Sequence, residues 1–345
     1  MTLHINGRNI GPEHPPYIIA ELSANHNGSL DTAKRIIAEA AKAGADAVKL
    51  QTYTADTITL KSDRPQFTIK GGLWNGRTLY DLYEEAHTPW DWHPALFQTA
   101  RDEGIDIFSS PFDPTAVDFL DSLGAPAFKV ASFEMIDTPL IRKMAEKGKP
   151  LIISTGMAVP EEIWDAVHAA QQAPGLILLH CVSGYPAPAS AYGLKRIPAM
   201  KAQFNTLVGL SDHTLDNATA VAAVALGACM IEKHFTLDRN GGGPDDSFSL
   251  EPNELKRLCQ DAKTAWEACQ EASYGPIAAE GGNIQFRRSL YFVQSLEEGA
   301  VITQNSVRSV RPGLGVPPKF LDDMLGKKVT RTVTANEPVL PGDWI

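Results

Sequence analysis

The sequence predicts an α/β protein whose main part is a closed (β/α)8 TIM barrel, followed by a small C-terminal domain. Eight short runs rich in β-branched and apolar residues recur within about 250 residues, and amphipathic stretches of helical length lie between them. Strands that alternate with helices pair in parallel. No Gly-x-Gly-x-x-Gly motif follows the first run, so a closed barrel is favoured over an open dinucleotide-binding sheet.

The expected strands are the eight apolar runs. In chain order they are residues 17–21, 47–51, 106–109, 127–131, 150–154, 176–181, 206–210 and 229–234. The expected helices are residues 30–43, 92–103, 115–123, 139–147, 160–172, 215–226 and 252–272. A glycine near the end of many of these stretches is typical of a helix C-terminus.

The loop after the second expected strand is unusually long. It runs from Tyr53 to Trp90 and carries Trp74, Tyr80 and Tyr83. Loops longer than about 12–15 residues are often lids or binding loops, so we predict a substrate lid; a surface-packed excursion is the alternative. A shorter loop, residues 238–248 with three consecutive glycines, is a second candidate for a mobile edge.

The pattern changes after the last expected helix. Residues 274–276 (Tyr-Gly-Pro) and 281–283 (Gly-Gly-Asn) mark a linker, and about 60 residues with short strand-like runs follow. Two similar turn-and-strand pieces are expected at 298–302 and 336–340. The predicted domains are residues 1–280 and 281–345. A module so small is expected to have little core of its own and to pack on the barrel or on a partner subunit.

Composition excludes several classes of function. The chain has 31 basic and 41 acidic residues, a formal charge of −10, which argues against nucleic acid or an anionic membrane as partner. The four cysteines show no Cys-x-x-Cys spacing, so a reducing cytoplasm is expected. Residues 1–10 lack a signal-peptide core, and the longest apolar stretch, 218–231, is too short to span a bilayer.

Polar residues stand at the end of nearly every expected strand, where the chemistry of such barrels takes place. Polar residues also begin many ordinary loops, but Lys49 and Lys129 lie inside apolar strands. An unpaired ammonium there would cost several kcal/mol. We therefore expect both lysines to face an anion.

Two histidines lie at the ends of neighbouring expected strands. Residues two apart in a strand share a face, so Ser211 projects with His213, and Glu232 projects with His234. Two imidazoles with oxygen donors and open positions would hold a catalytic divalent metal, and Mn²⁺ or Mg²⁺ is favoured over structural zinc. The alternative is that each histidine is simply a satisfied or surface residue.

Several segments resemble the sialic acid synthase family, whose members condense phosphoenolpyruvate with an acylated amino sugar. They are 19–21 (Ile-Ala-Glu), 25–28 (Asn-His-Asn-Gly), 49–51 (Lys-Leu-Gln), 110–112 (Ser-Pro-Phe), 129–134 (Lys-Val-Ala-Ser-Phe-Glu), 154–157 (Ser-Thr-Gly-Met), 180–181 (His-Cys), 209–214 (Gly-Leu-Ser-Asp-His-Thr) and 232–235 (Glu-Lys-His-Phe). The C-terminal domain is similar to the family's antifreeze-like (SAF) module. The resemblance covers essentially the whole chain.

Within that family the chain looks most like the branch that makes pseudaminic acid from 2,4-diacetamido-2,4,6-trideoxy-altropyranose. This rests on residues 129–134, 79–90 and 287–291. Ser110 stands where a threonine is usual in the neuraminate branch, and Ser183 where an asparagine is usual. N-acetylneuraminate and legionaminate synthesis are the alternatives within the family.

The resemblance implies a role for each candidate residue. Glu21 would stabilise the reaction's cationic carbon or deprotonate water, with Glu134 and Glu232 as alternatives, and His213 and His234 would hold the metal. Arg311 would reach the sugar from the partner subunit of a domain-swapped homodimer. The remaining expected contacts are Tyr185 and Asp245 to the sugar, and Lys49, Gln51, Ser110, Lys129, Ser132, Ser154, Ser183 and Ser211 to phosphoenolpyruvate.

Two other classes of function remain open at the level of sequence. A Schiff-base aldolase could use Lys129 as nucleophile, but it would need neither the two histidines nor the serines. A non-catalytic sugar- or ice-binding protein is suggested by the terminal module alone, and it leaves the polar strand ends unexplained.

Overall fold

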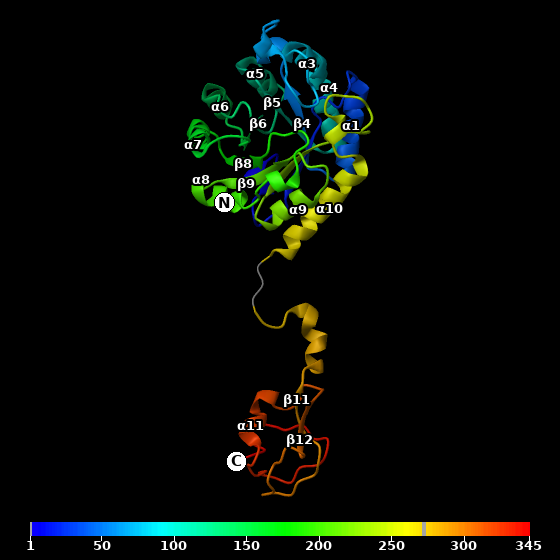
Figure 1. Ribbon diagram of the computed structural model, residues 1–345, viewed down its shortest axis with the longest axis vertical. Helices are drawn as coiled ribbons and strands as arrows, with labels where there is room; N and C mark the ends of the chain where they lie inside the picture. Colours follow the sequence, from blue (N-terminus) through cyan, green and yellow to red (C-terminus); the bar gives the residue numbers. More distant parts are fainter. Residues whose placement is uncertain (1, 271–273) are drawn as a thin grey trace. The chain divides into compact units, whose positions relative to one another are not determined.

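A computed structural model describes residues 2–270 and 274–345 (Figure 1). The chain divides into two compact units, Met1–Gln270 and Glu271–Ile345, which are described separately. The last two positions of the helix expected at 252–272 lie outside the described residues.

The first unit is the predicted barrel. Eight parallel strands close in the order β10-β3-β4-β5-β6-β7-β8-β9, and each overlaps one of the expected runs. They are β3 (Tyr17–Glu21), β4 (Ala47–Thr52), β5 (Asp106–Pro111), β6 (Phe128–Val130), β7 (Leu151–Ser154), β8 (Leu176–Cys181), β9 (Leu207–Asp212) and β10 (Met230–His234). β9 extends two residues past its expected end, so Ser211 and Asp212 belong to the strand.

All seven expected helices are present. They are α1 (Leu30–Ala43), α4 (His93–Glu103), α5 (Pro114–Ser122), α6 (Thr138–Ala145), α7 (Pro160–Ala169), α9 (Ala218–Ala225) and α10 (Pro252–Ala268). The helix between β8 and β9, α8 (Arg196–Phe204), was not predicted. Its buried face consists of Ile197, Met200 and Phe204, a weak apolar signal in a segment rich in proline.

A hairpin that the sequence analysis missed packs into the amino-terminal end of the barrel. β1 (Leu3–Ile5) pairs antiparallel with β2 (Arg8–Ile10). The turn residues Asn6 and Gly7 both have positive φ, 47° and 83°, as a type I′ turn requires. Leu3, Ile5 and Ile10 share a core cluster with residues from the starts of the barrel strands. Apolar side chains therefore fill this end, and the polar residues gather at the other.

The long loop after β4 contains α2 (Ala55–Ile58) and α3 (Leu79–Ala86). Pro244 lies in the loop after β10, and its carbonyl accepts a hydrogen bond from the indole of Trp74 at 3.3 Å. The two loops predicted as a lid and a second edge are thus in contact. Segments of 3₁₀ helix lie at Pro65–Phe67, Trp90–Trp92, Ala189–Ala191, Asp246–Phe248, Ala278–Phe286 and Pro318–Phe320.

The second unit contains β11 (Ser289–Phe292), paired antiparallel with β12 (Val307–Val310), and α11 (Leu321–Met324). The strands expected at 298–302 and 336–340 are wrong, because these pieces contribute only isolated bridges at Val301 and Pro338. The expectation of little internal core is also wrong. Nine buried apolar residues, including Leu290, Phe292 and Val333, form a cluster of their own. Across both described ranges, no helix is long and apolar enough to cross a membrane.

Candidate active site

The barrel register brings the predicted polar residues together at the carboxyl ends of the strands. Lys49 lies beside Glu21 and Gln51 lies beside Ser110. Ser211 of β9 lies beside Glu232 of β10, and β10 closes the barrel by pairing with β3. The site is therefore assembled from residues that are up to about two hundred positions apart in the chain.

Two buried lysines share one carboxylate. Lys49 forms an ion pair with Glu21, and its Nζ lies 3.8 Å from Oε1 of Glu232. The Nζ of Lys129 lies 3.9 Å from the same oxygen, to which Ser211 Oγ donates at 3.3 Å. Glu232 thus lies between the two cations that the sequence placed inside apolar strands.

Hydroxyl and amide groups surround these ions. Lys129 donates to Ser154 Oγ at 2.7 Å, and Lys49 donates to Ser110 Oγ at 3.4 Å. Gln51 donates to Oε1 of Glu21 at 3.0 Å, and Oε2 of Glu21 is the oxygen that forms the ion pair with Lys49. Most of the predicted phosphoenolpyruvate cradle is therefore one connected network.

The charge balance of this network favours an anion. Burial acts to raise the pKa of Glu232, but Lys129 and Lys49 hold it below its ordinary value. Burial raises the pKa of Glu21 to about 7 despite its pairing with Lys49. The two lysines therefore face one firmly ionised carboxylate and a second with a pKa of about 7. Burial lowers the pKa of Lys129, so an anionic ligand would stabilise its ammonium form.

Ser132 and Ser183 complete the predicted set from the loops after β6 and β8. Their hydroxyls are 2.8 Å apart. Gly156, after β7, lies against them with φ of +47°, and a Cβ at this position would lie 2.6 Å from Cβ of Ser132. Glycine is required there, because any larger residue would push the three loops apart.

The rings of the two predicted metal ligands lie edge to face, with centroids 5.5 Å apart. His213 Nδ1 donates to the carbonyl of Val182 at 2.8 Å, which leaves Nε2 with a lone pair. His234 Nδ1 is buried and has no hydrogen-bond partner. Burial lowers the pKa of both rings, so both are neutral. Among the described residues, no three His, Cys, Asp or Glu side chains are grouped so that they could hold a metal ion.

Aromatic side chains line the space beside these histidines. The ring of Tyr185 lies 4.3 Å from His213 and 5.5 Å from Phe248, centroid to centroid. Trp74 of the long loop lies 6.2 Å from Tyr185. Sequence reasoning gave Trp74 and Phe248 no individual role, although both stand in the loops it singled out.

Asp245 is held close to the histidines by a residue that the sequence analysis missed. Ser23 donates to Asp245, and Gln51 donates to Ser23 at 2.9 Å. Oδ2 of Asp245 lies 3.9 Å from Nδ1 of His234. Ser23 follows β3 by two residues, so its place after a strand end was the available signal.

Glu134 differs from the other two candidate carboxylates. Oε2 of all three is buried without a hydrogen-bond partner, but among the described residues no lysine or arginine nitrogen lies within ion-pair distance of Glu134. Burial raises the pKa of Glu134 to about 7 even though Lys129 and Lys49 act to lower it. Glu21 and Glu232 are instead engaged by cations. Arg311 belongs to the second unit, where its side chain is exposed. The structure does not place it relative to the barrel residues.

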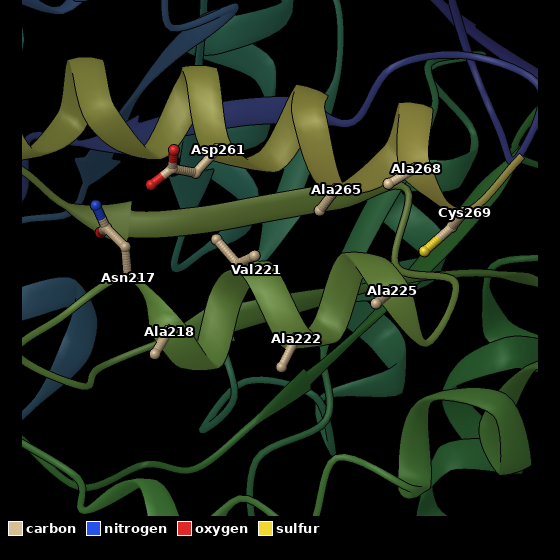
Figure 2. A pocket seen from close by; sticks show the side chains of 9 residues that line it. All are labelled: Asn217, Ala218, Val221, Ala222, Ala225, Asp261, Ala265, Ala268 and Cys269. Atoms are coloured by element: carbon tan, nitrogen blue, oxygen red, sulfur yellow. The ribbon is translucent and has the colours of Figure 1, made fainter. Parts of the chain in front are cut away.

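The groove in Figure 2 is a separate feature with a volume of about 650 Å³. It lies between α9 and α10 and is lined mainly by alanine side chains, with Asn217, Asp261 and Cys269 among them. None of its lining residues belongs to the strand-end network. We therefore assign the chemistry to the strand ends.

Comparison with known proteins identifies relatives of the whole chain. The NeuB family model matches residues 36–274, and the SAF domain model matches residues 287–343. A pseudaminic acid synthase from Campylobacter jejuni is 43% identical and covers 97% of this chain and 98% of its own. The enzyme of the same name from Helicobacter pylori is 40% identical, over 95% and 98%. A Leptospira borgpetersenii N-acetylneuraminic acid synthetase structure has a TM-score of 0.74 at 31% identity, covering 83% and 96%.

Proposed function

Because the chain belongs to the NeuB family, we propose that it condenses phosphoenolpyruvate with 2,4-diacetamido-2,4,6-trideoxy-altropyranose and water to give pseudaminic acid and phosphate. The observation that carries the proposal is the buried pair Lys49 and Lys129 around Glu232. The two ammonium groups lie in a cradle lined by serine hydroxyls. A carboxylate and a phosphate on one small substrate match those donors.

We propose that His213 and His234 hold a divalent metal, Mn²⁺ or Mg²⁺, which would polarise the aldehyde oxygen of the open-chain sugar. The support is the pair of neutral imidazoles, one oriented by the carbonyl of Val182 and the other with an unpartnered buried nitrogen. A metal-ligating histidine commonly donates its second nitrogen in this way.

The other residues bind and orient. Lys129, Lys49 and the serines would fix phosphoenolpyruvate so that its methylene carbon faces the aldehyde carbon, and a carbon–carbon bond forms between them. The resulting cationic carbon takes a hydroxyl from water, and carbon–oxygen cleavage then releases phosphate. Glu134 has a pKa of about 7 and, unlike Glu21 and Glu232, forms no ion pair with a lysine among the described residues, so it is the group best suited to accept the proton of that water.

The aromatic wall supports a sugar with apolar substituents. Tyr185, Phe248 and Trp74 present ring faces and edges beside the histidines, and such surfaces suit a 6-methyl group and acetamido methyl groups. Asp245 and Ser23 supply polar contacts at the same place.

The product assignment is tested by supplying three sugars side by side with phosphoenolpyruvate. These are the altro-configured diacetamido hexose, its legionaminate-pathway stereoisomer and N-acetylmannosamine, with products identified by mass and NMR. We expect the first to have the highest kcat/KM by at least about tenfold, roughly 1.4 kcal/mol of transition-state discrimination. A preference of that size for N-acetylmannosamine would overturn the product and leave the reaction class intact.

The metal proposal predicts that chelation stops the reaction. Enzyme dialysed against a strong chelator should release no phosphate above background, because the two histidines alone carry no positive charge to polarise the aldehyde. Added Mn²⁺ or Mg²⁺ should restore turnover. Full phosphate release by metal-free enzyme would refute the proposal.

We further propose a cytoplasmic homodimer in which the second unit of one subunit covers the barrel of the other. Exposed apolar side chains after β6 and β7 support a cover: Phe133, Ile136 and Met157 are 58%, 65% and 62% exposed. The four cysteines are free thiols, which agrees with a reducing compartment.

Mixing two inactive variants tests the domain swap. Arg311→Ala and His234→Ala should each be inactive alone. After subunit exchange, a swapped heterodimer rebuilds one intact site, so roughly a quarter of wild-type activity should return by statistical mixing. Each variant incubated alone is the control. An unswapped protein would recover nothing.

A further inference from the structure

Two charged residues lie on the outward face of β9 and β10, between residues that point into the site. Asp212 stands between Ser211 and His213, and Lys233 stands between Glu232 and His234. Neighbouring residues of a strand face opposite sides. The parallel register places Lys233 directly beside Asp212, and both side chains are almost fully buried.

The ammonium group of Lys233 uses all its donors on the neighbouring strand and the loop that follows. Its Nζ donates to Oδ2 of Asp212 and to the carbonyls of Thr214 and Asp216, each at 2.8 Å. These two carbonyls belong to the segment that leaves β9 immediately after His213. Lys233 of β10 therefore holds the loop that follows β9 in place through hydrogen bonds to its backbone.

Other contacts fix the orientation of His213. Its backbone N–H donates to the hydroxyl of Tyr192 at 2.6 Å, and its Nδ1 donates to Val182. These anchors come from the segment after β8. Lys233, in contrast, is adjacent in sequence to His234, so its bonds link the backbone of one histidine to the backbone of the other.

We propose that Lys233 is a positioning residue that sets the separation of His213 and His234 and thereby the affinity of the site for a divalent cation. The inference rests on the metal site of the proposed function. Stability alone does not account for the pair, because a buried ion pair is often no more stabilising than apolar residues of the same volume. A positioning role does account for the pair, because all three hydrogen bonds of Lys233 go to residues 212–216, on both sides of His213.

Direct binding of Mn²⁺, followed by the electron paramagnetic resonance of the free ion, tests the proposal. Lys233→Met should raise the Kd for Mn²⁺ by about 10- to 100-fold, the usual effect of losing a group that orients a metal ligand. The double variant Asp212→Asn/Lys233→Met removes the unpaired buried carboxylate, so it should unfold at a higher temperature than Lys233→Met while binding Mn²⁺ as weakly.

Tyr17→Phe is the matched control. Tyr17 is also buried, and its hydroxyl donates to Asp106 at 2.7 Å, but it lies at the opposite end of the barrel. This variant should lose stability and keep its Mn²⁺ affinity within about twofold of wild type. Wild-type affinity in the folded double variant would overturn the role of Lys233 alone. Failure of the wild-type protein to bind Mn²⁺ would overturn the metal site and this inference together.

Discussion

Lys129→Met should raise the phosphoenolpyruvate concentration for half-saturation by at least about 30-fold, while the KM for the sugar changes little. Lys129 is 1% exposed and donates to Ser154 and to the carbonyl of Val130. Removing one partner of a buried charge pair typically costs about 2–5 kcal/mol. Serine hydroxyls cannot replace that charge against an anionic substrate. Initial rates at varied concentrations of each substrate check the expectation.

Lys147→Met is the control for this substitution. Lys147 pairs with Asp118 and Asp121 on the outer surface of the barrel, so its loss should leave both KM values within about twofold of wild type. The thermal midpoint of Lys129→Met should stay close to that of wild type, because Glu232 keeps Lys49 as a cation. Unchanged half-saturation by phosphoenolpyruvate in Lys129→Met would contradict the assignment of the cradle.

Local signals were sufficient to predict the barrel strands and most of the helices. The range of α1 was predicted to the residue, because Ser29 accepts from the backbone N–H of Thr32 at one end and Gly44 adopts the left-handed conformation at the other. The missed hairpin shows that such signals were also present elsewhere. Asn6-Gly7 between two short apolar runs is a strong hairpin signal, but three-residue strands are too short to show a clear alternation.

The strand face on which each site residue lies could be predicted from the sequence, but the contacts between these residues could not. Alternation along a strand placed Glu232 and His234 on one face, and the structure has them there. It could not show that Glu232 bridges both lysines, because this depends on closure of the barrel between strands that are distant in sequence. The bond between Ser23 and Asp245, 222 residues apart, is invisible for the same reason.

The choice among three carboxylates depended on such pairings. Sequence and resemblance favoured Glu21, but its two oxygens are engaged by Lys49 and Gln51. Glu232 is bound to Ser211 and lies between two cations. Glu134 shares with them a buried oxygen that has no hydrogen-bond partner, but among the described residues it forms no ion pair with a lysine or arginine, so we propose it as the group that accepts the proton of water.

This assignment predicts the pH dependence of the reaction. Burial raises the pKa of Glu134 to about 7, and a base acts in its ionised form. The rate constant kcat should therefore fall as the pH drops below about 7 and level off above it. Glu134→Gln should lower kcat by about 10²- to 10⁴-fold and abolish this dependence, because an amide neither accepts the proton nor titrates.

Glu21→Gln distinguishes this role from that of a binding residue. The pKa of Glu21 is also raised to about 7 by burial, so the wild-type profile alone does not identify the titrating group. Losing the negative charge beside Lys49 should change the KM for phosphoenolpyruvate, while the decline of kcat below pH 7 remains. If Glu21→Gln removes the decline and Glu134→Gln keeps it, Glu21 is the base and Glu134 is not. The base is therefore the carboxylate whose replacement removes the decline of kcat. The wild-type profile cannot identify it, because both carboxylates have a pKa of about 7.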